Sequence, residues 1–307
     1  MEGVVLGFAT IAVVIAVGAL VAHLGVVDLG AQQVLSRLAF FVASPALLLT
    51  TVAEADVQDV LSPSLVATVA GIAVVVLAYW AIVTWRWRRS RGERVIGALA
   101  SSYVNAGNLG LPVAAYVLGD AALVAPTLLL QLLLLQPLAL ALLDADVRGR
   151  RPRVRDFLLR PLTNPLTIGT LLGLLLSITG WRLPTVVADP VELIGAMAVP
   201  GMLLAYGIAL RLGPGFGGGV APGELALTSI LKLAVQPVVA YAVADLALGL
   251  DGAALLAVVV CSSLPTAQNI FVHATRYDRA TTLARDTILV TTVGAVPVIA
   301  LVVLLLG

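Results

Sequence analysis

The chain is poor in charge, in aromatic side chains and in metal-binding residues. Of its 307 residues, 11% are charged and 5% are aromatic, and there are one cysteine and two histidines. The sequence contains no H-E-x-x-H, G-x-x-x-x-G-K-[ST] or G-x-S-x-G motif, which argues against a zinc protease, an ATP-driven pump and a serine hydrolase. The sequence therefore predicts neither an enzyme nor a bound metal or cofactor.

Hydrophobic length is what the chain has in abundance. It is 60% hydrophobic with a mean hydropathy of +1.07, and apolar runs of about 20 residues, the length that crosses hydrocarbon, recur throughout. We predict an all-α membrane protein with ten transmembrane helices. The predicted spans are 4–24, 35–53, 65–85, 95–118, 121–143, 162–179, 191–210, 225–248, 253–273 and 287–306.

Basic residues predict the orientation of these spans. Sixteen of the seventeen arginines lie in alternate loops or at their edges, and Arg182 is the exception. The positive-inside rule places the arginine-rich loops in the cytoplasm, so both termini are expected outside the cytoplasm. The expected location of the protein is the inner (plasma) membrane of the cell. Arginine-rich loops could also bind nucleic acid or lipid headgroups. Topology alone accounts for them, and we expect the bilayer and no nucleic acid as a partner.

The sequence S-S-x-x-x-A-x-N occurs twice, at 101–108 and 262–269. The copies are about 160 residues apart, which favours two five-helix repeats, 1–143 and 161–307, joined by a basic linker at 144–160. An odd number of helices per repeat gives the second copy inverted topology. Coincidence among frequent small residues is the alternative.

Each copy also contains helix breakers, Gly110 with Pro112 in the first and Pro265 in the second. Matched discontinuous helices indicate a transporter with a midplane substrate site, because unwound backbone in a membrane is tolerated where it lines a cavity. Alternatively, the nearby amides only satisfy the broken backbone. The candidate substrate-binding residues are Asn105, Asn108, Gly110, Pro112, Pro265, Thr266, Gln268 and Asn269, with Ser101, Ser102 and Ser263 in support.

The single lysine of the chain, Lys232, lies within the eighth predicted span, and Gln236 follows one helical turn later. A charge there costs roughly 3 kcal/mol unless it is paired or hydrated, which makes Lys232 a candidate for coupling or charge balance. The alternative is that Lys232 snorkels to the interface or ties helix ends. The broken segments contain no carboxylate, which argues against a proton-driven cation antiporter. Coupling to sodium or to a proton otherwise stays open.

Several segments resemble the auxin efflux carrier family, in the order and spacing that its prokaryotic members show. The matching segments are 40–49, 105–112, 164–169, 232–237 and 265–269. The resemblance implies a ten-helix fold related to that of bile acid sodium symporters, with scaffold helices 1, 2, 6 and 7. It also implies transport helices 3–5 and 8–10, in which discontinuous helices 4 and 9 cross near Asn108, Pro112, Pro265 and Asn269.

From these features we predict a secondary transporter of a small organic anion, a carboxylate such as malate or an auxin-like acid, working by elevator-type alternating access. A homodimer through the scaffold helices is the expected assembly. Two alternatives remain, a sodium-coupled symporter of bile-acid-like amphipathic anions and a membrane receptor or sensor for an organic anion.

Overall fold

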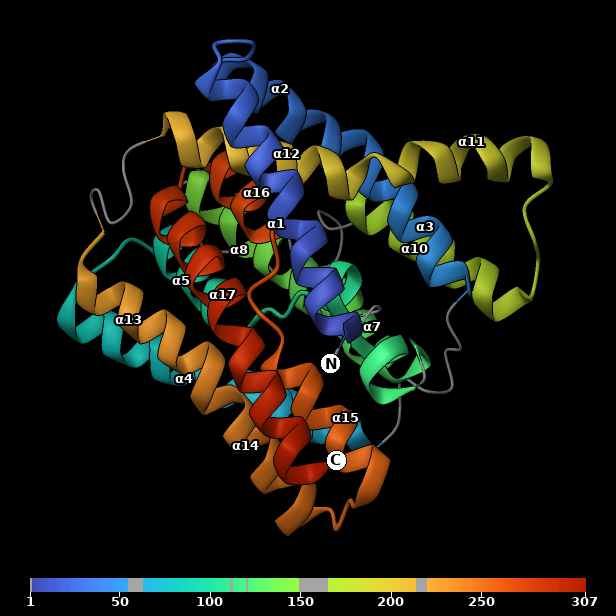
Figure 1. The fold of residues 1–307 in the computed structure, drawn as a ribbon, viewed down its shortest axis with the longest axis vertical. Helices are drawn as coiled ribbons and strands as arrows, with labels where there is room; N and C mark the ends of the chain where they lie inside the picture. The colour runs from blue at the N-terminus through green and yellow to red at the C-terminus, as the bar shows by residue number, and fades with distance from the viewer. Residues whose placement is uncertain (1, 55–62, 111–112, 120, 149–164, 214–219) are drawn as a thin grey trace. The chain divides into compact units, whose positions relative to one another are not determined.

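The computed structural model describes residues 2–54, 63–110, 113–119, 121–148, 165–213 and 220–307 (Figure 1). In these ranges the chain is helical and contains no β-strand, apart from one isolated bridge between Val104 and Thr266. A helix satisfies its own backbone polar groups, which hydrocarbon demands. The predicted class of helical membrane protein is confirmed, whereas ten helices in two inverted repeats remain a prediction.

Five described helical stretches are long and apolar enough to cross a membrane. They are Leu29–Glu54, Ser64–Arg86, Thr185–Leu212, Pro222–Ala247 and Thr281–Leu306. Two shorter apolar helices are Ala12–His23 and Gly252–Ser263. The second of these ends at the repeated serine motif, where the helix stops instead of continuing across a membrane.

The chain divides into two compact units. Unit 1 comprises Met1–Ile11, Leu61–Leu128 and Pro214–Gly307, and unit 2 comprises Ala12–Val60 and Leu129–Gly213. The long helix α1 (Glu2–His23) and the short helix α7 (Ala125–Leu130) each have residues in both units. The division into repeats at 144–160 falls largely outside the described residues and stays a prediction.

Unit 1 contains the interrupted helices. Its remaining elements are α4 (Pro63–Arg86), α5 (Arg91–Ser102), η3 (Ala106–Gly110), η4 (Ala114–Leu118), η5 (Ala121–Val124), α13 (Pro222–Ile230), η8 (Leu231–Val235), α14 (Gln236–Ala242), η9 (Val243–Ala247), α15 (Gly252–Ser263), α16 (Asn269–Tyr277) and α17 (Thr281–Leu306). Small and β-branched side chains pack α4, α14 and α15 together, with Ala67, Ala240 and Val259 in one buried cluster. A second cluster joins Tyr79 of α4, Ala98 of α5 and Leu231 of η8.

Unit 2 is also built from helices. Besides the remainder of α1, they are α2 (Leu29–Leu38), η1 (Ala39–Ala43), α3 (Ser44–Glu54), η6 (Gln131–Leu135), α8 (Gln136–Val147), α10 (Pro165–Thr179), α11 (Thr185–Ala196) and α12 (Ala198–Leu212). Helices α3 and α10 approach closely, because Gly169 and Gly173 on α10 face the backbone of α3. A Cβ at Gly173 would lie 2.6 Å from the Leu49 carbonyl oxygen. Such small-x-x-x-small spacing lets membrane helices pack backbone to backbone.

Among the helices that begin earlier than predicted, α2 and α17 have polar residues in their first turns. Helix α2 begins at Leu29 and not at residue 35, and the Asp28 side chain caps it by accepting a bond of 2.8 Å from Ala31 N. Helix α17 begins at Thr281 and not at residue 287, so it includes the buried pair Arg285 and Asp286. A prediction from hydropathy leaves such polar turns out of the helix, because hydropathy does not take account of the hydrogen bonds that satisfy polar groups.

Candidate functional site

The two copies of the repeated motif meet in unit 1 through their unwound backbones. Helix α5 ends at Ser102 and α15 ends at Ser263, and after each the chain becomes extended. The extended segments pair antiparallel at Val104 and Thr266. Asn105 N donates to the Pro265 carbonyl oxygen at 2.8 Å, and Ala267 N donates to the Tyr103 carbonyl oxygen at 3.1 Å. We call residues 103–105 with 264–268 the paired break.

The pairing explains how unwound backbone is tolerated in an apolar fold. A buried N–H or C=O without a partner is costly, and each break supplies the partners of the other. The Thr266 hydroxyl adds a bond to the Ala100 carbonyl oxygen in the last turn of α5. Thr266 N in turn donates to Thr291 Oγ1 of α17, at 3.1 Å. Two helices, α5 and α17, together with the extended segment at Val104, therefore fix the geometry of Thr266.

Lys232 and Gln236 lie beside the paired break and are both buried. Lys232 Nζ donates to Gln236 Oε1 and to the Ser262 carbonyl oxygen, each at 2.8 Å. Gln236 Nε2 donates to the Ser102 carbonyl oxygen at 3.0 Å. The prediction that Lys232 and Gln236 share one helical face is confirmed. The two side chains connect the C-terminal ends of α5 and α15.

The candidate serines use their hydroxyls within their own helices. Ser101, Ser102 and Ser263 each donate to the carbonyl oxygen four residues earlier, at 2.7 to 2.8 Å. Their contribution to the break is thus through the backbone, as when Ser102 accepts from Gln236. Ser262 differs, because its buried hydroxyl oxygen has no hydrogen-bond partner within the described part of the chain.

Three of the four candidate amides can be placed with their side chains. Asn105 and Gln268 are buried, and Asn269, the first residue of α16, is partly exposed. A side-chain hydrogen bond joins Asn269 to Tyr103 of the other motif copy. The Asn108 side chain and Pro112 lie outside what the structure describes, so the predicted approach of Asn108 to Asn269 stays a prediction.

Comparison with known proteins bears on the function of the whole chain. A family model described as "Membrane transport protein" matches residues 4–303, nearly the whole chain. The chain belongs to this membrane transport family. The match confirms the resemblance to prokaryotic auxin efflux carriers that the motifs indicated. A protein of Rhizobium meliloti (strain 1021) described as "Putative malonate transporter" is 26% identical over 262 residues, which are 83% of this chain and 81% of that protein.

Gly110 has a packing role in this transport protein. The sequence suggested that Gly110 lets the helix unwind, but α5 already ends eight residues earlier, at Ser102. A Cβ at Gly110 would lie 2.7 Å from Val124 Cγ2 and 3.1 Å from Leu264 Cδ1. Glycine at this position lets the segment after the first break pack against the second break.

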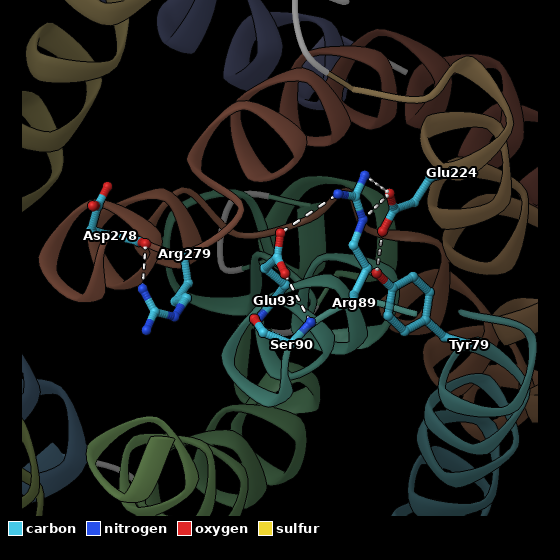
Figure 2. A network of polar contacts seen from close by, with 7 residues as sticks. All are labelled: Tyr79, Arg89, Ser90, Glu93, Glu224, Asp278 and Arg279. Carbon is cyan, nitrogen blue, oxygen red and sulfur yellow. Dashed lines mark hydrogen bonds and ion pairs between the residues drawn. The ribbon is translucent and has the colours of Figure 1, made fainter. Parts of the chain in front are cut away.

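A polar network in unit 1 joins α4, the turn before α5 and the start of α13 (Figure 2). Glu224 of α13 is buried and accepts from Tyr79 Oη at 3.0 Å and from Arg89 Nη2 at 2.7 Å. Arg89 also lies 3.6 Å from Glu93 Oε1, and Ser90 with Glu93 caps α5. A cavity of about 250 Å³ beside this network is also lined by Asp278 and Thr281, from the connection between α16 and α17.

The transporter also contains buried polar residues on α17 that the sequence analysis did not select. Thr287 and Thr228 of α13 share a hydroxyl hydrogen bond of 2.8 Å. Arg285 Nη2 and Asp286 Oδ1 form an ion pair of 2.7 Å, with both side chains buried. The sequence could have indicated only Thr228, because it lies four residues before Lys232 and so on the same helical face. No sequence pattern indicated the residues on α17. Among the described residues, no group of three or more His, Cys, Asp or Glu could hold a metal ion.

Proposed function

We propose that this protein is a secondary transporter of a small organic anion, a carboxylate of the size of malonate or malate, with the paired break at its substrate site. Membership of a membrane transport family supports transport, and the description of the Rhizobium meliloti relative supports a short dicarboxylate. The observation that carries the proposal is the meeting of two unwound segments beside Lys232 and Gln236.

The chemistry of the paired break suits an anion. Helix α16 begins at Asn269, and the N-terminus of a helix presents N–H groups and partial positive charge. The buried Ser262 hydroxyl can donate to a ligand oxygen. In our proposal Asn108 and Asn269 donate hydrogen bonds to the carboxylate, and Asn105, Thr266 and Gln268 line the site.

The remaining candidates shape or support this site in the proposal. Pro265 keeps its segment out of helical geometry, a role that the sequence predicts for Pro112 as well, and Gly110 keeps the segments close. Ser101, Ser102 and Ser263 secure the helix ends, and Lys232 and Gln236 join those ends. Each candidate residue therefore has one proposed role, and mutation of that residue can test it.

Alternating access would arise from movement of one group of helices past another. Unit 1 contains the third and fourth predicted spans and the eighth to tenth, while unit 2 contains the second, sixth and seventh and most of the first. This grouping supports an elevator-type displacement of transport helices against a scaffold. The fifth predicted span has residues in both units. Assembly as a homodimer through the scaffold belongs to the same proposal.

Uptake of labelled carboxylates into proteoliposomes tests the function. We expect malonate or malate to be carried, and Asn269→Ala to reduce the flux about 10- to 100-fold, because a hydrogen bond to a charged group is worth about 1.5–3 kcal/mol. Gln32→Ala is the matched control, since Gln32 is a buried amide of α2 in unit 2, bonded to Ser36. We expect Gln32→Ala to keep its flux.

Three results would contradict the proposal. If Asn269→Ala transported carboxylates at the wild-type rate, the paired break would not be the substrate site. Uptake of bile-acid-like anions only in the presence of sodium would favour the amphipathic-anion symporter, and saturable binding of a carboxylate without any flux would favour a receptor.

A further inference from the structure

Lys232 has the surroundings of a bound cation. Its side chain is fully buried, and its Nζ donates at 2.8 Å to a backbone carbonyl oxygen and to an amide oxygen. Among the described residues no carboxylate lies within ion-pair distance of Lys232. Neutral oxygens are therefore its hydrogen-bond partners within that part of the chain.

Those oxygens belong to the ends of the two interrupted helices. Ser262 is the next-to-last residue of α15, and Ser102, which Gln236 bonds, is the last residue of α5. The last carbonyl groups of a helix have no partner within the helix and carry partial negative charge. Lys232 and Gln236 satisfy one such carbonyl on each helix, so the Lys232 nitrogen lies where two helix ends of partial negative charge meet.

Half-helix C-termini and unwound carbonyls are also the groups that coordinate sodium in transporters with broken helices. An ammonium bonded to such a group prevents a second cation from binding there, because like charges at short range repel strongly in a medium of low dielectric constant.

We propose that the Lys232 ammonium is a built-in cation at the place that a coupling sodium ion would otherwise take, so that carboxylate transport by this protein is independent of sodium. The sodium-independent flux rests on the transport function proposed above. The cation site itself does not, because it is defined by contacts of the protein without substrate.

Thermal unfolding of the purified protein without any carboxylate tests the cation site. Melting is compared in sodium chloride and in choline chloride at equal ionic strength. A ligand that binds only the folded state raises stability with its concentration. We expect the wild type to melt at the same temperature in both salts, and a saturable stabilisation by sodium would overturn the proposal.

Two variants test the same carbonyl oxygens. Lys232→Ala removes the ammonium and leaves space, so we expect sodium to raise its melting temperature in a saturable manner. Lys232→Met fills the space without charge, and we expect no response to sodium. A folded Lys232→Ala protein that ignores sodium would overturn the assignment of a cation place. If Lys232→Ala does not fold, the wild-type comparison decides.

Flux into proteoliposomes completes the experiment, with malonate as the probe. We expect equal wild-type rates with sodium or choline outside, and faster uptake in sodium would overturn the proposal. Absence of flux with every carboxylate would contradict the proposed function alone, since the melting comparison still tests the built-in cation.

Discussion

At the scale of single residues, Glu224 shows how this protein keeps a carboxylate in an apolar interior. The side chain is 1% exposed and accepts hydrogen bonds from Tyr79 and from two nitrogens of Arg89. The hydrogen bond to Glu224 raises the pKa of the Arg89 guanidinium above its ordinary value. Arg89 thus stays charged, and Glu224 connects α13 to α4 and to the turn before α5.

Replacing Glu224 should show the worth of this connection. Glu224→Gln removes the charge that Arg89 pairs with, and we expect a loss of about 1–2 kcal/mol in stability, moderated by the partial exposure of Arg89. Glu93→Gln is the control, because glutamine also completes the capping box and the ion pair at 3.6 Å is long and partly exposed. We expect it to change stability by less than about 0.5 kcal/mol. Melting in detergent measures both, and equal losses would contradict the role of Glu224.

At the scale of elements, the interrupted helices depend on groups outside themselves. The broken ends of α5 and α15 are satisfied by each other, by Gln236 and by Thr291. A proline or a glycine can end a helix, but it does not supply partners for the carbonyl and N–H groups that are then released. The partners come from α14 and α17, so the breaks are properties of the whole of unit 1.

Thr291 offers a direct test at this scale. Thr291→Val keeps the shape and leaves Thr266 N without its acceptor, which should cost about 1–3 kcal/mol and speed hydrogen exchange of the amides of residues 264 and 266–268. Thr291→Ser keeps the hydroxyl and should cost about 0.8 kcal/mol for the lost methyl group, with slow exchange. Faster exchange in the serine variant, or slow exchange in the valine variant, would show that the hydroxyl does not hold the break.

At the scale of the whole molecule, three segments that the arginine pattern predicts to lie on the same side of the membrane line one cavity. The loop at Arg89, the start of α13 at Glu224 and the connection at Asp278 line one cavity of unit 1. All three belong to segments that the arginine pattern predicts to be cytoplasmic. Family membership and five long apolar helices make this a multi-pass membrane protein, and the sidedness of its loops is the prediction to test.

Cysteine labelling can determine that sidedness. In a Cys261→Ala background, which removes the buried native thiol, we expect Arg182→Cys to react with an impermeant maleimide in intact cells. Arg279→Cys should react only after the membrane is opened, because its loop is predicted to be cytoplasmic. The reverse pattern would invert the topology, and labelling of both in intact cells would place the two loops on one side.

The sequence by itself determined the features that depend on composition and local spacing. Apolar length indicated a helical membrane protein, short motifs indicated the transport family, and the four-residue spacing put Lys232 and Gln236 on one helical face. These inferences succeed because the hydrophobic effect acts along the chain and because helical geometry is fixed within one turn.

The tertiary structure alone decided what the released polar groups contact. It paired Val104 with Thr266, connected Lys232 to Ser262 and Gln236 to Ser102, and brought in Thr291, for which the sequence carried no signal. It also ended α5 at Ser102, before the predicted breakers Gly110 and Pro112. Such contacts join residues up to 166 positions apart, as between Ala100 and Thr266, and depend on how helices pack, which no local pattern encodes.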